Sequence, residues 1–266
     1  MLKRVVTGIL AAAYVIAMVL LGRTAMLLNL GVVLLLGMYE ILTTLSSGGI
    51  KPLGWVYYVY AAALIPAYVF FAETGLLIAV MVGMLVFMAI ECVRSEPDAK
   101  RMLGALLPAF YPALPLMALV MLICNEGPFW RMLIWMTFAM SAVSDVFALF
   151  GGKFFGKRKL IPRVSPNKTV AGAYSGVVGA VVAALVIYFI TVFRGEDLNV
   201  LMFIGLGILG SVITQLGDIV ASYIKRFCGV KDFGKIFPGH GGLLDRLDGI
   251  IFTAVGMCIF MLLTGF

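Results

Sequence analysis

The sequence predicts an all-α integral membrane protein with about nine transmembrane helices, an N-terminus in the cytoplasm and a C-terminus outside. Of the 266 residues, 63% are hydrophobic and only 12% are charged, whereas soluble domains are nearer half apolar and a quarter charged. So few charged side chains cannot cover a globular surface of this size. The composition therefore excludes a soluble enzyme, a disordered chain and a small secreted domain held together by disulfides.

Long apolar runs, separated by charges, glycine or proline, mark the expected helices. A spanning helix needs about 20 apolar residues. The expected helices are 5–21, 25–45, 55–71, 75–93, 102–123, 129–149, 172–193, 198–220 and 249–265. The first run has no small-residue cleavage site after it, so we expect a retained helix and not a signal peptide. Pro108, Pro112 and Pro115 lie within the fifth run, which should therefore be kinked or broken.

The basic residues predict how the chain is oriented. With nine spans, the loops on one side of the membrane carry 17 of the 20 Lys and Arg residues, and the other side carries only Arg23, Arg131 and Arg194. Cytoplasmic loops are enriched in Lys and Arg, so the richer side should be cytoplasmic. We therefore expect a protein of the plasma (inner) membrane whose active site faces the cytoplasm.

Two polar cytoplasmic segments, 151–171 and 221–248, interrupt the second half of the sequence. We expect residues 1–128 to form N-terminal transmembrane helices with a lipid groove. Residues 129–266 should form C-terminal transmembrane helices that carry both polar segments. The first half is nearly featureless apart from Glu40 and Glu91, for which snorkelling toward the membrane surface is an adequate explanation.

The second polar segment and its flanks carry several groups suited to phosphate chemistry. On a helix, Asp218, Ser222 and Lys225 share one face, as do Asp245 and Asp248. Mg²⁺ takes one or two carboxylates together with phosphate oxygens, and Lys and Arg neutralise the remaining phosphate charge. A basic loop is usually only a topology signal, and a carboxylate at a helix start is often a cap. A carboxylate at the end of an apolar helix is nevertheless costly unless it is partnered, which favours function.

The first polar segment follows Asp145 at the end of the sixth expected helix. Its six basic residues, from Lys153 to Lys168, could bind a triphosphate or only an anionic membrane surface. The segment ends in Ser165-Pro166-Asn167-Lys168-Thr169, which places donors and a cation beside a turn. It is not a phosphate-binding P-loop, because the G-x-x-x-x-G-K-[ST] pattern is absent.

From Ser222 to Asp248 the sequence resembles the phosphatidate cytidylyltransferases, also called CDP-diacylglycerol synthases. The matching pattern is S-x-x-K-R at Ser222–Arg226, K-D at Lys231-Asp232, P-x-H-G-G at Pro238–Gly242 and D-R-x-D at Asp245–Asp248. Gln215-x-Gly217-Asp218 and Ser165-Pro166-x-Lys168-Thr169 also look like the family. The resemblance covers about the last 125 residues.

The resemblance implies transfer of CMP from CTP to phosphatidate, with Mg²⁺ as cofactor and room for a second cation. It implies catalytic roles for Asp218, Lys225, Arg226, Asp245, Arg246 and Asp248. The metal ligands would come from Asp218, Asp245, Asp248 and Asp145. Substrates would be bound by Ser165, Lys168, Ser222, Lys231, Asp232, His240, Gly241 and Gly242. A homodimer is compatible with the resemblance, although the sequence shows no interface.

Other functions stay open at this point. The same transfer could act on another lipid phosphate, because the first half shows no readable selectivity. A transporter usually places ionisable groups near the midplane in repeated, broken helices, and no repeat is visible here. A structural lipid-binding protein would need a defective metal site. The basic excess of +7 indicates loops and an anionic ligand more than nucleic acid, and the four cysteines form no CxxC pair.

Overall fold

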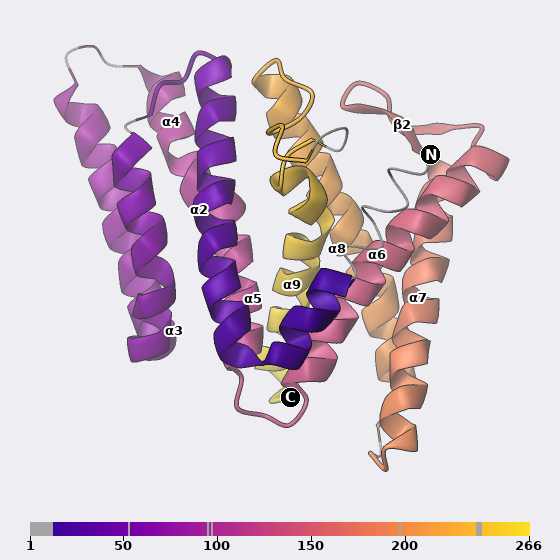
Figure 1. The fold of residues 1–266 in the computed structure, drawn as a ribbon. Helices are drawn as coiled ribbons and strands as arrows, with labels where there is room; N and C mark the ends of the chain where they lie inside the picture. The colour runs from indigo at the N-terminus through magenta and orange to yellow at the C-terminus, as the bar shows by residue number, and fades with distance from the viewer. Residues whose placement is uncertain (1–12, 53, 95, 97, 197, 238–240) are drawn as a thin grey trace. The chain divides into compact units, whose positions relative to one another are not determined.

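The computed structural model describes residues 13–266 except 53, 95, 97, 197 and 238–240 (Figure 1). The chain divides into two compact units. The first contains the chain up to Cys124 together with Cys228–Asp245, and the second contains Asn125–Phe227 and Arg246–Phe266. The described residues include seven helices that are long and apolar enough to cross a membrane. The chain is thus a helical membrane protein.

The first unit consists of helices and one long loop. Its elements are α2 (Arg23–Ser47), α3 (Gly54–Val93), α4 (Ala99–Pro108), the π-helical turn η1 (Ala109–Ala113) and α5 (Leu114–Cys124). Residues 13–21 are also helical, in agreement with the second part of the run predicted at 5–21. The start of that run lies outside the described residues, so the count of nine spans stays a prediction.

Helix α3 is a hairpin of two helices and not one long rod. Ala72 has φ 51° and ψ −144°, which breaks the helix. Beyond this break the chain returns along itself, because the Tyr57 ring stacks on the Phe87 ring with centroids 4.3 Å apart. The Tyr60 ring contacts the same phenylalanine edge-on. The separate helices predicted at 55–71 and 75–93 are therefore confirmed.

The helix predicted at 102–123 is broken, as its prolines indicated. α4 ends at Pro108, and Tyr111 within η1 has an extended backbone with φ −146° and ψ 117°. Asp98 caps the start of α4, since its Oδ1 accepts hydrogen bonds from the backbone amides of Lys100 and Arg101. This cap explains why α4 begins at Ala99, earlier than expected.

The second unit is built from four helices and a small hairpin. They are α6 (Trp130–Phe155), β1 (Lys159–Ile161), β2 (Ser165–Thr169), α7 (Val170–Phe193), α8 (Val200–Phe227) and α9 (Leu244–Thr264), the last from Arg246 onward. β1 and β2 are antiparallel, with Lys159 opposite Thr169. The candidate membrane spans are all helices, as predicted. The hairpin is an addition that the prediction did not contain, because turn residues between 156 and 165 let the chain fold back on itself.

The helices extend further into both polar segments than predicted. α6 continues to Phe155 and α8 to Phe227, while α9 already begins at Leu244. The end of an apolar run marks where a helix leaves the hydrocarbon layer, but its backbone hydrogen bonds continue into the polar layer beyond. The described loop residues are therefore 156–158 and 162–164 around the hairpin, and 228–237 and 241–243 between α8 and α9.

Close helix packing holds the second unit together. α7 packs against both α6 and α8. A Cβ at Gly207 of α8 would lie 2.7 Å from Val181 Cα of α7, and one at Gly172 would lie 2.7 Å from the Ala148 carbonyl oxygen of α6. Small residues allow such approach between membrane helices, whose association depends on van der Waals packing and hydrogen bonds. One such bond joins the hydroxyls of Ser144 and Ser211, 2.8 Å apart.

This packing makes a matched pair of substitutions informative. Gly207→Ala should lower the free energy of unfolding by about 1–3 kcal/mol, because the new methyl group pushes α7 and α8 apart. Gly205→Ala on the same helix should cause no loss, since nothing lies within 4 Å of its Cβ position. Thermal unfolding of both variants in detergent measures the difference. Equal stability of the two variants would contradict the close α7–α8 contact.

Candidate functional site

A cluster of six charged residues lies in the second unit. It combines Asp145 of α6, Asp218 of α8 and Asp248 of α9 with Lys168, Lys225 and Arg246. The Asp218 carboxylate lies close enough to repel the carboxylates of Asp145 and Asp248 electrostatically. Lys168 and Arg246 attract the Asp145 carboxylate, and Lys225 attracts that of Asp248. We call these residues the charged cluster. It contains three acidic and three basic side chains.

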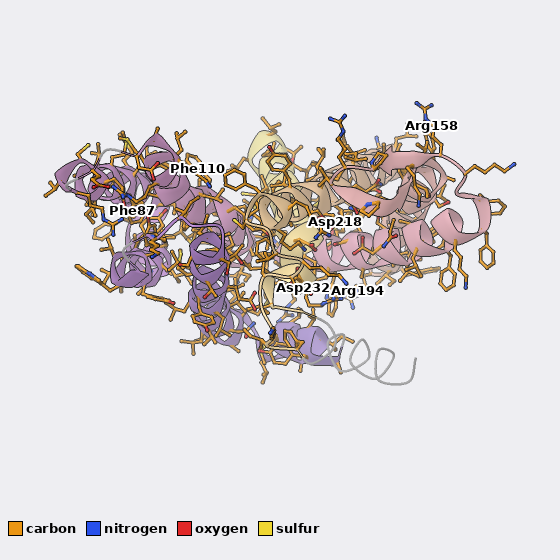
Figure 2. All side chains as sticks on the ribbon, turned by 90° about the horizontal axis from the view of Figure 1, so that it is seen from above. Phe87, Phe110, Arg158, Arg194, Asp218 and Asp232 are labelled. Atoms are coloured by element: carbon orange, nitrogen blue, oxygen red, sulfur yellow. The ribbon has the colours of Figure 1, made fainter. Side chains whose placement is uncertain are left out.

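Lys168 and Asp218 form the most direct contact in the charged cluster. The Lys168 Nζ lies 2.8 Å from Asp218 Oδ2, and the two side chains are 27% and 18% exposed. The hairpin and the start of α7 place this lysine. Thr169, which follows it, caps α7 by accepting a hydrogen bond from the Gly172 amide at 3.1 Å. Figure 2 labels Asp218, and also Arg158, which precedes β1 and is exposed.

Two glycines bring Asp218 and Asp248 close together. A Cβ at Gly217 would lie 2.5 Å from the carbonyl oxygen of Asp248, so α8 and α9 touch backbone to backbone. A Cβ at Gly249 would lie 3.1 Å from Asp218 Oδ1. The Gly249 amide also donates a hydrogen bond to Asp248 Oδ1 at 3.0 Å. The glycines beside the two aspartates in the sequence thus determine how near their carboxylates can come.

The donor set of the charged cluster suits Mg²⁺ held together with a phosphate. Among the described residues, no group of three His, Cys, Asp or Glu side chains stands close enough to hold a metal alone. Mg²⁺ does not require such a group, because it typically takes one or two carboxylates and completes its shell with phosphate oxygens and water. Asp218 and Asp248, brought together at the α8–α9 contact, supply such a pair of oxygen donors.

The other predicted residues of the second unit flank the charged cluster. Ser222 lies one turn beyond Asp218 on α8 and is half-buried, and Arg226 is exposed near the end of that helix. Ser165 begins β2, three residues before Lys168. The helical face predicted for Asp218, Ser222 and Lys225 is confirmed, because α8 runs without a break to Phe227.

The remaining predicted residues belong to the first unit, in the loop 228–243 and at the start of α9. We call the segment 228–243 the signature loop, of which the structure describes 228–237 and 241–243. Asp245 Oδ2 accepts hydrogen bonds from the Phe233 amide at 2.8 Å and the Gly242 amide at 2.9 Å, so this carboxylate organises the loop. Gly241 has φ +84°, a conformation that favours glycine. The metal role predicted for Asp245 stays a prediction.

Two further predicted residues of the signature loop, Lys231 and Asp232, are exposed, and Asp232 is labelled in Figure 2. His240 lies outside the described residues. The loop also contains a backbone bridge, in which the Phe237 amide donates to the Gly241 carbonyl at 3.0 Å. The predicted residues are therefore divided between the two units. Those of the signature loop and Asp245 belong to the first unit, and all the others belong to the second.

The sequence reasoning noted Glu40 but did not find its role in the structure. It is 0% exposed, and its carboxylate accepts hydrogen bonds from the Leu243 and Leu244 amides, each at 2.8 Å. The interpretation of Glu40 as a snorkelling residue is therefore wrong. An unpartnered carboxylate in an apolar helix is costly, and this argument singled out Asp218 in the sequence. The same argument applies to Glu40 and would have indicated that it has a buried partner.

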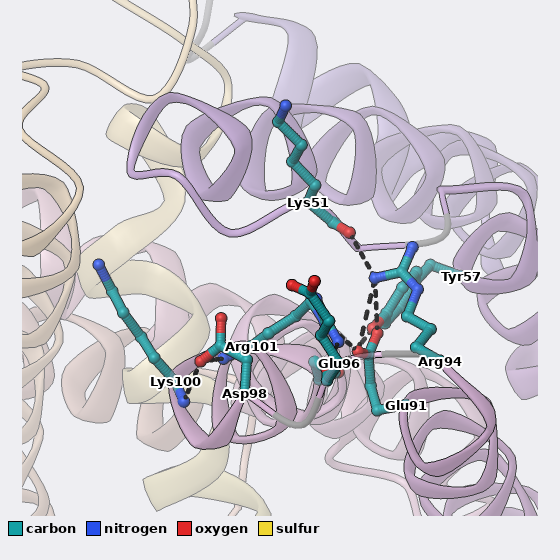
Figure 3. Close-up of polar contacts among 9 residues, drawn as sticks. Lys51, Tyr57, Glu91, Arg94, Glu96, Asp98, Lys100 and Arg101 are labelled. Carbon is teal, nitrogen blue, oxygen red and sulfur yellow. Dashed lines mark hydrogen bonds and ion pairs between the residues drawn. The ribbon is translucent and has the colours of Figure 1, made fainter.

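Glu91 is also buried and partnered, so its snorkelling interpretation is wrong as well. Its carboxylate lies 2.6 Å from Arg101 Nε and 3.1 Å from an Arg94 guanidinium nitrogen. Arg94 also donates to the Lys51 carbonyl at 2.9 Å (Figure 3). These contacts tie the end of α3 to the start of α4 and to the chain before α3.

The chain is similar in sequence to several known proteins. A family model described as the cytidylyltransferase family matches residues 2–264. The chain is 39% identical over 144 residues to a phosphatidate cytidylyltransferase of Rickettsia bellii, covering 53% of this chain and 62% of that protein. A Helicobacter pylori protein of the same name is 39% identical over 153 residues, covering 58% and 54%.

A third relative, the uncharacterised protein YnbB of Escherichia coli, is 44% identical over 116 residues, which is 44% of this chain and 38% of YnbB. The chain thus spans less than two thirds of each of these relatives.

The Lys168–Asp218 pair has a measurable consequence for stability. Lys168→Gln should lower the free energy of unfolding by about 1–2 kcal/mol, because Asp218 then faces two other carboxylates without its nearest cation. Lys153→Gln, which removes an exposed lysine of the same unit, is the matched control and should unfold like the wild type. Chemical denaturation in detergent compares the three proteins. A Lys168→Gln protein as stable as the control would show that the ion pair contributes nothing.

Proposed function

Since this chain belongs to the cytidylyltransferase family, we propose that it moves CMP from CTP to phosphatidate, yielding CDP-diacylglycerol and pyrophosphate for phospholipid synthesis. The observation that carries this proposal is the charged cluster, in which Asp218 and Asp248 meet at the α8–α9 contact beside Lys168. The names of the Rickettsia and Helicobacter relatives support phosphatidate as the acceptor. The uncharacterised Escherichia coli relative is the reason to test other lipid phosphates as well.

The proposed reaction needs little acid–base help. A phosphate monoester has a second pKa near 6, so the phosphate of phosphatidate is largely a dianion at neutral pH. One of its oxygens attacks the α-phosphorus of CTP. A new P–O–P bond forms, the bond from the α-phosphorus to the bridging oxygen breaks, and pyrophosphate leaves with that electron pair. The main obstacle is repulsion between two anions, which positive groups must relieve.

The basic side chains of the cluster support this role. Lys168, Lys225 and Arg246 supply three positive charges that substrate phosphates can share. In the ligand-free protein Lys168 is paired with Asp218. A phosphate that draws Lys168 away would leave Asp218 Oδ2 open to a cation. Ser165 and Ser222 would contribute hydroxyl groups to the same substrates, and Arg226 a further charge.

We propose Asp218 and Asp248 as the first ligands of Mg²⁺, with Asp145 and Asp245 as further candidates and a second cation as part of the same hypothesis. Bound there, Mg²⁺ would neutralise phosphate charge and orient the reacting groups. In the signature loop, Lys231 and Asp232 with His240, Gly241 and Gly242 would bind the nucleotide or pyrophosphate.

The membrane arrangement belongs to the same proposal. The break in α3 raises the candidate spans from seven to eight, and a helix over 5–21 would make nine. Residues 13–21 are helical, which supports that helix. With nine spans the charged cluster, the signature loop and most Lys and Arg residues face the cytoplasm, where CTP is made. The plasma (inner) membrane and a homodimer remain the expected setting.

The reaction is tested with purified full-length protein in detergent, labelled CTP, Mg²⁺ and a panel of lipid phosphates that includes phosphatidate. We expect a labelled CDP-lipid from phosphatidate, and a loss of at least about 100-fold in Asp248→Asn, because a charge-stabilising ligand is removed. Glu126→Gln, an exposed acidic residue in the second unit, is the control and should keep its activity. No product with any lipid phosphate would refute the enzyme, and product only with another acceptor would refute phosphatidate.

Metal binding can be tested without the reaction. A ligand that binds only the folded state raises its stability by RT ln(1 + [L]/Kd). With CTP present, Mg²⁺ should therefore raise the melting temperature of the wild type, and the increase should shrink in Asp218→Asn and Asp248→Asn. Glu126→Gln should keep the full increase. An undiminished increase in both aspartate variants would refute them as ligands.

A further inference from the structure

Glu40 connects the featureless first half of the sequence to the signature loop. It lies in α2, and its two carboxylate oxygens accept from consecutive backbone amides, Oε1 from Leu243 and Oε2 from Leu244. Leu243 is the last residue of the loop and Leu244 the first of α9. Helix starts leave such amides without partners inside the helix. Here the partner comes from a residue about 200 positions earlier in the sequence.

The signature loop is shaped to receive this carboxylate. Gly234 and Gly242 both lie against Glu40, and a Cβ at either position would overlap its carboxylate. Gly242 belongs to the P-x-H-G-G pattern, whereas Gly234 lies outside every motif identified in the sequence. Both glycines are therefore required by the same buried side chain. Because Glu40 is 0% exposed, water cannot replace these backbone contacts.

Other residues on the same face of α2 also contact the signature loop and the start of α9. Gly37 lies against the Leu244 side chain, and Gly48 lies against the backbone of Cys228. Between them, the Thr44 hydroxyl donates to the Phe233 carbonyl at 3.4 Å. With Glu40, these residues are spaced three or four apart and so form one stripe on the helix. This stripe touches both ends and the middle of the signature loop.

We propose that Glu40 is a positioning residue, which holds the signature loop in the conformation that binds the phosphates of CTP. It acts through the backbone at residues 243 and 244 and does not itself touch the substrate. Both side-chain oxygens are needed as acceptors. An amide in their place would present its NH2 donor to one of the two backbone N–H donors. The proposal rests on the proposed function for its substrate, but its effect on the loop does not depend on catalysis.

Hydrogen exchange in the absence of substrate tests the effect on the loop. In Glu40→Gln, backbone exchange across 233–244 should be at least about tenfold faster than in the wild type, because hydrogen bonds to a charged group are lost. Glu91→Gln is the matched control. It removes another buried carboxylate of the same unit, whose partners are the side chains of Arg94 and Arg101. It should leave exchange across 233–244 unchanged.

Kinetics then separate positioning from a merely structural role. Per folded molecule, Glu40→Gln should raise the KM for CTP about tenfold and change kcat by less than about threefold, because the loop binds substrate while the charged cluster is intact. Glu91→Gln should lower thermal stability but leave both constants near the wild-type values. A Glu40→Gln protein that is only less stable, with unchanged exchange across the loop and unchanged KM, would overturn the proposal.

Gly234→Ala provides a second variant if Glu40→Gln does not fold. It keeps the carboxylate but displaces it from the loop, and it should reproduce the faster exchange and the higher KM. Where all proteins fold, the double variant Glu40→Gln with Gly234→Ala should show no faster exchange and no higher KM than the single variants. The reason is that both substitutions disturb the same interaction. Normal exchange and KM in Gly234→Ala would overturn the proposal. A wild type without transferase activity would refute only the proposed function, since the exchange result still decides what Glu40 does to the loop.

Discussion

The structure depends on one constraint, which is the cost of a charge inside an apolar helix. A carboxylate removed from water must find hydrogen bonds or an opposite charge. Three buried or half-buried carboxylates meet this requirement in different ways. Glu40 uses two backbone amides, Glu91 uses two arginines, and Asp218 uses Lys168. These partners join segments far apart in the sequence, so the same requirement that makes the charges expensive also organises the fold.

The carboxylates of the charged cluster and those at the signature loop have different kinds of partners. In the cluster, carboxylates from α6, α8 and α9 lie among three cations, and in the proposed function these ionic partners would be exchanged for a substrate phosphate or a metal. In the loop, Asp245 and Glu40 bind backbone amides, which stabilise one loop conformation. Exchangeable side-chain partners suit catalysis, whereas backbone partners suit a rigid framework. Both kinds of group occur within the one pattern that ends at Asp248.

Much of this could be predicted from the sequence, because hydrophobicity and charge are local properties. The apolar runs located the helices, and the three prolines located the break near Tyr111. The motif spacing singled out Asp218 and Asp248, whose roles stay a prediction. Helix ends were less accurate, since α6 and α8 continue past the last apolar residue. The β1–β2 hairpin was not foreseen, because its short strands lie in a basic stretch without an alternating apolar pattern.

The sequence by itself determined the membrane class, the approximate spans and the residue types available for phosphate chemistry, since these follow from composition and spacing along the chain. Only the tertiary structure decided which partners those residues have. It assigned Lys168 to Asp218 and Glu40 to the amides at the start of α9. The physical reason is that a buried charge is satisfied by whatever donor the fold brings within about 3 Å, and that donor can lie anywhere in the sequence.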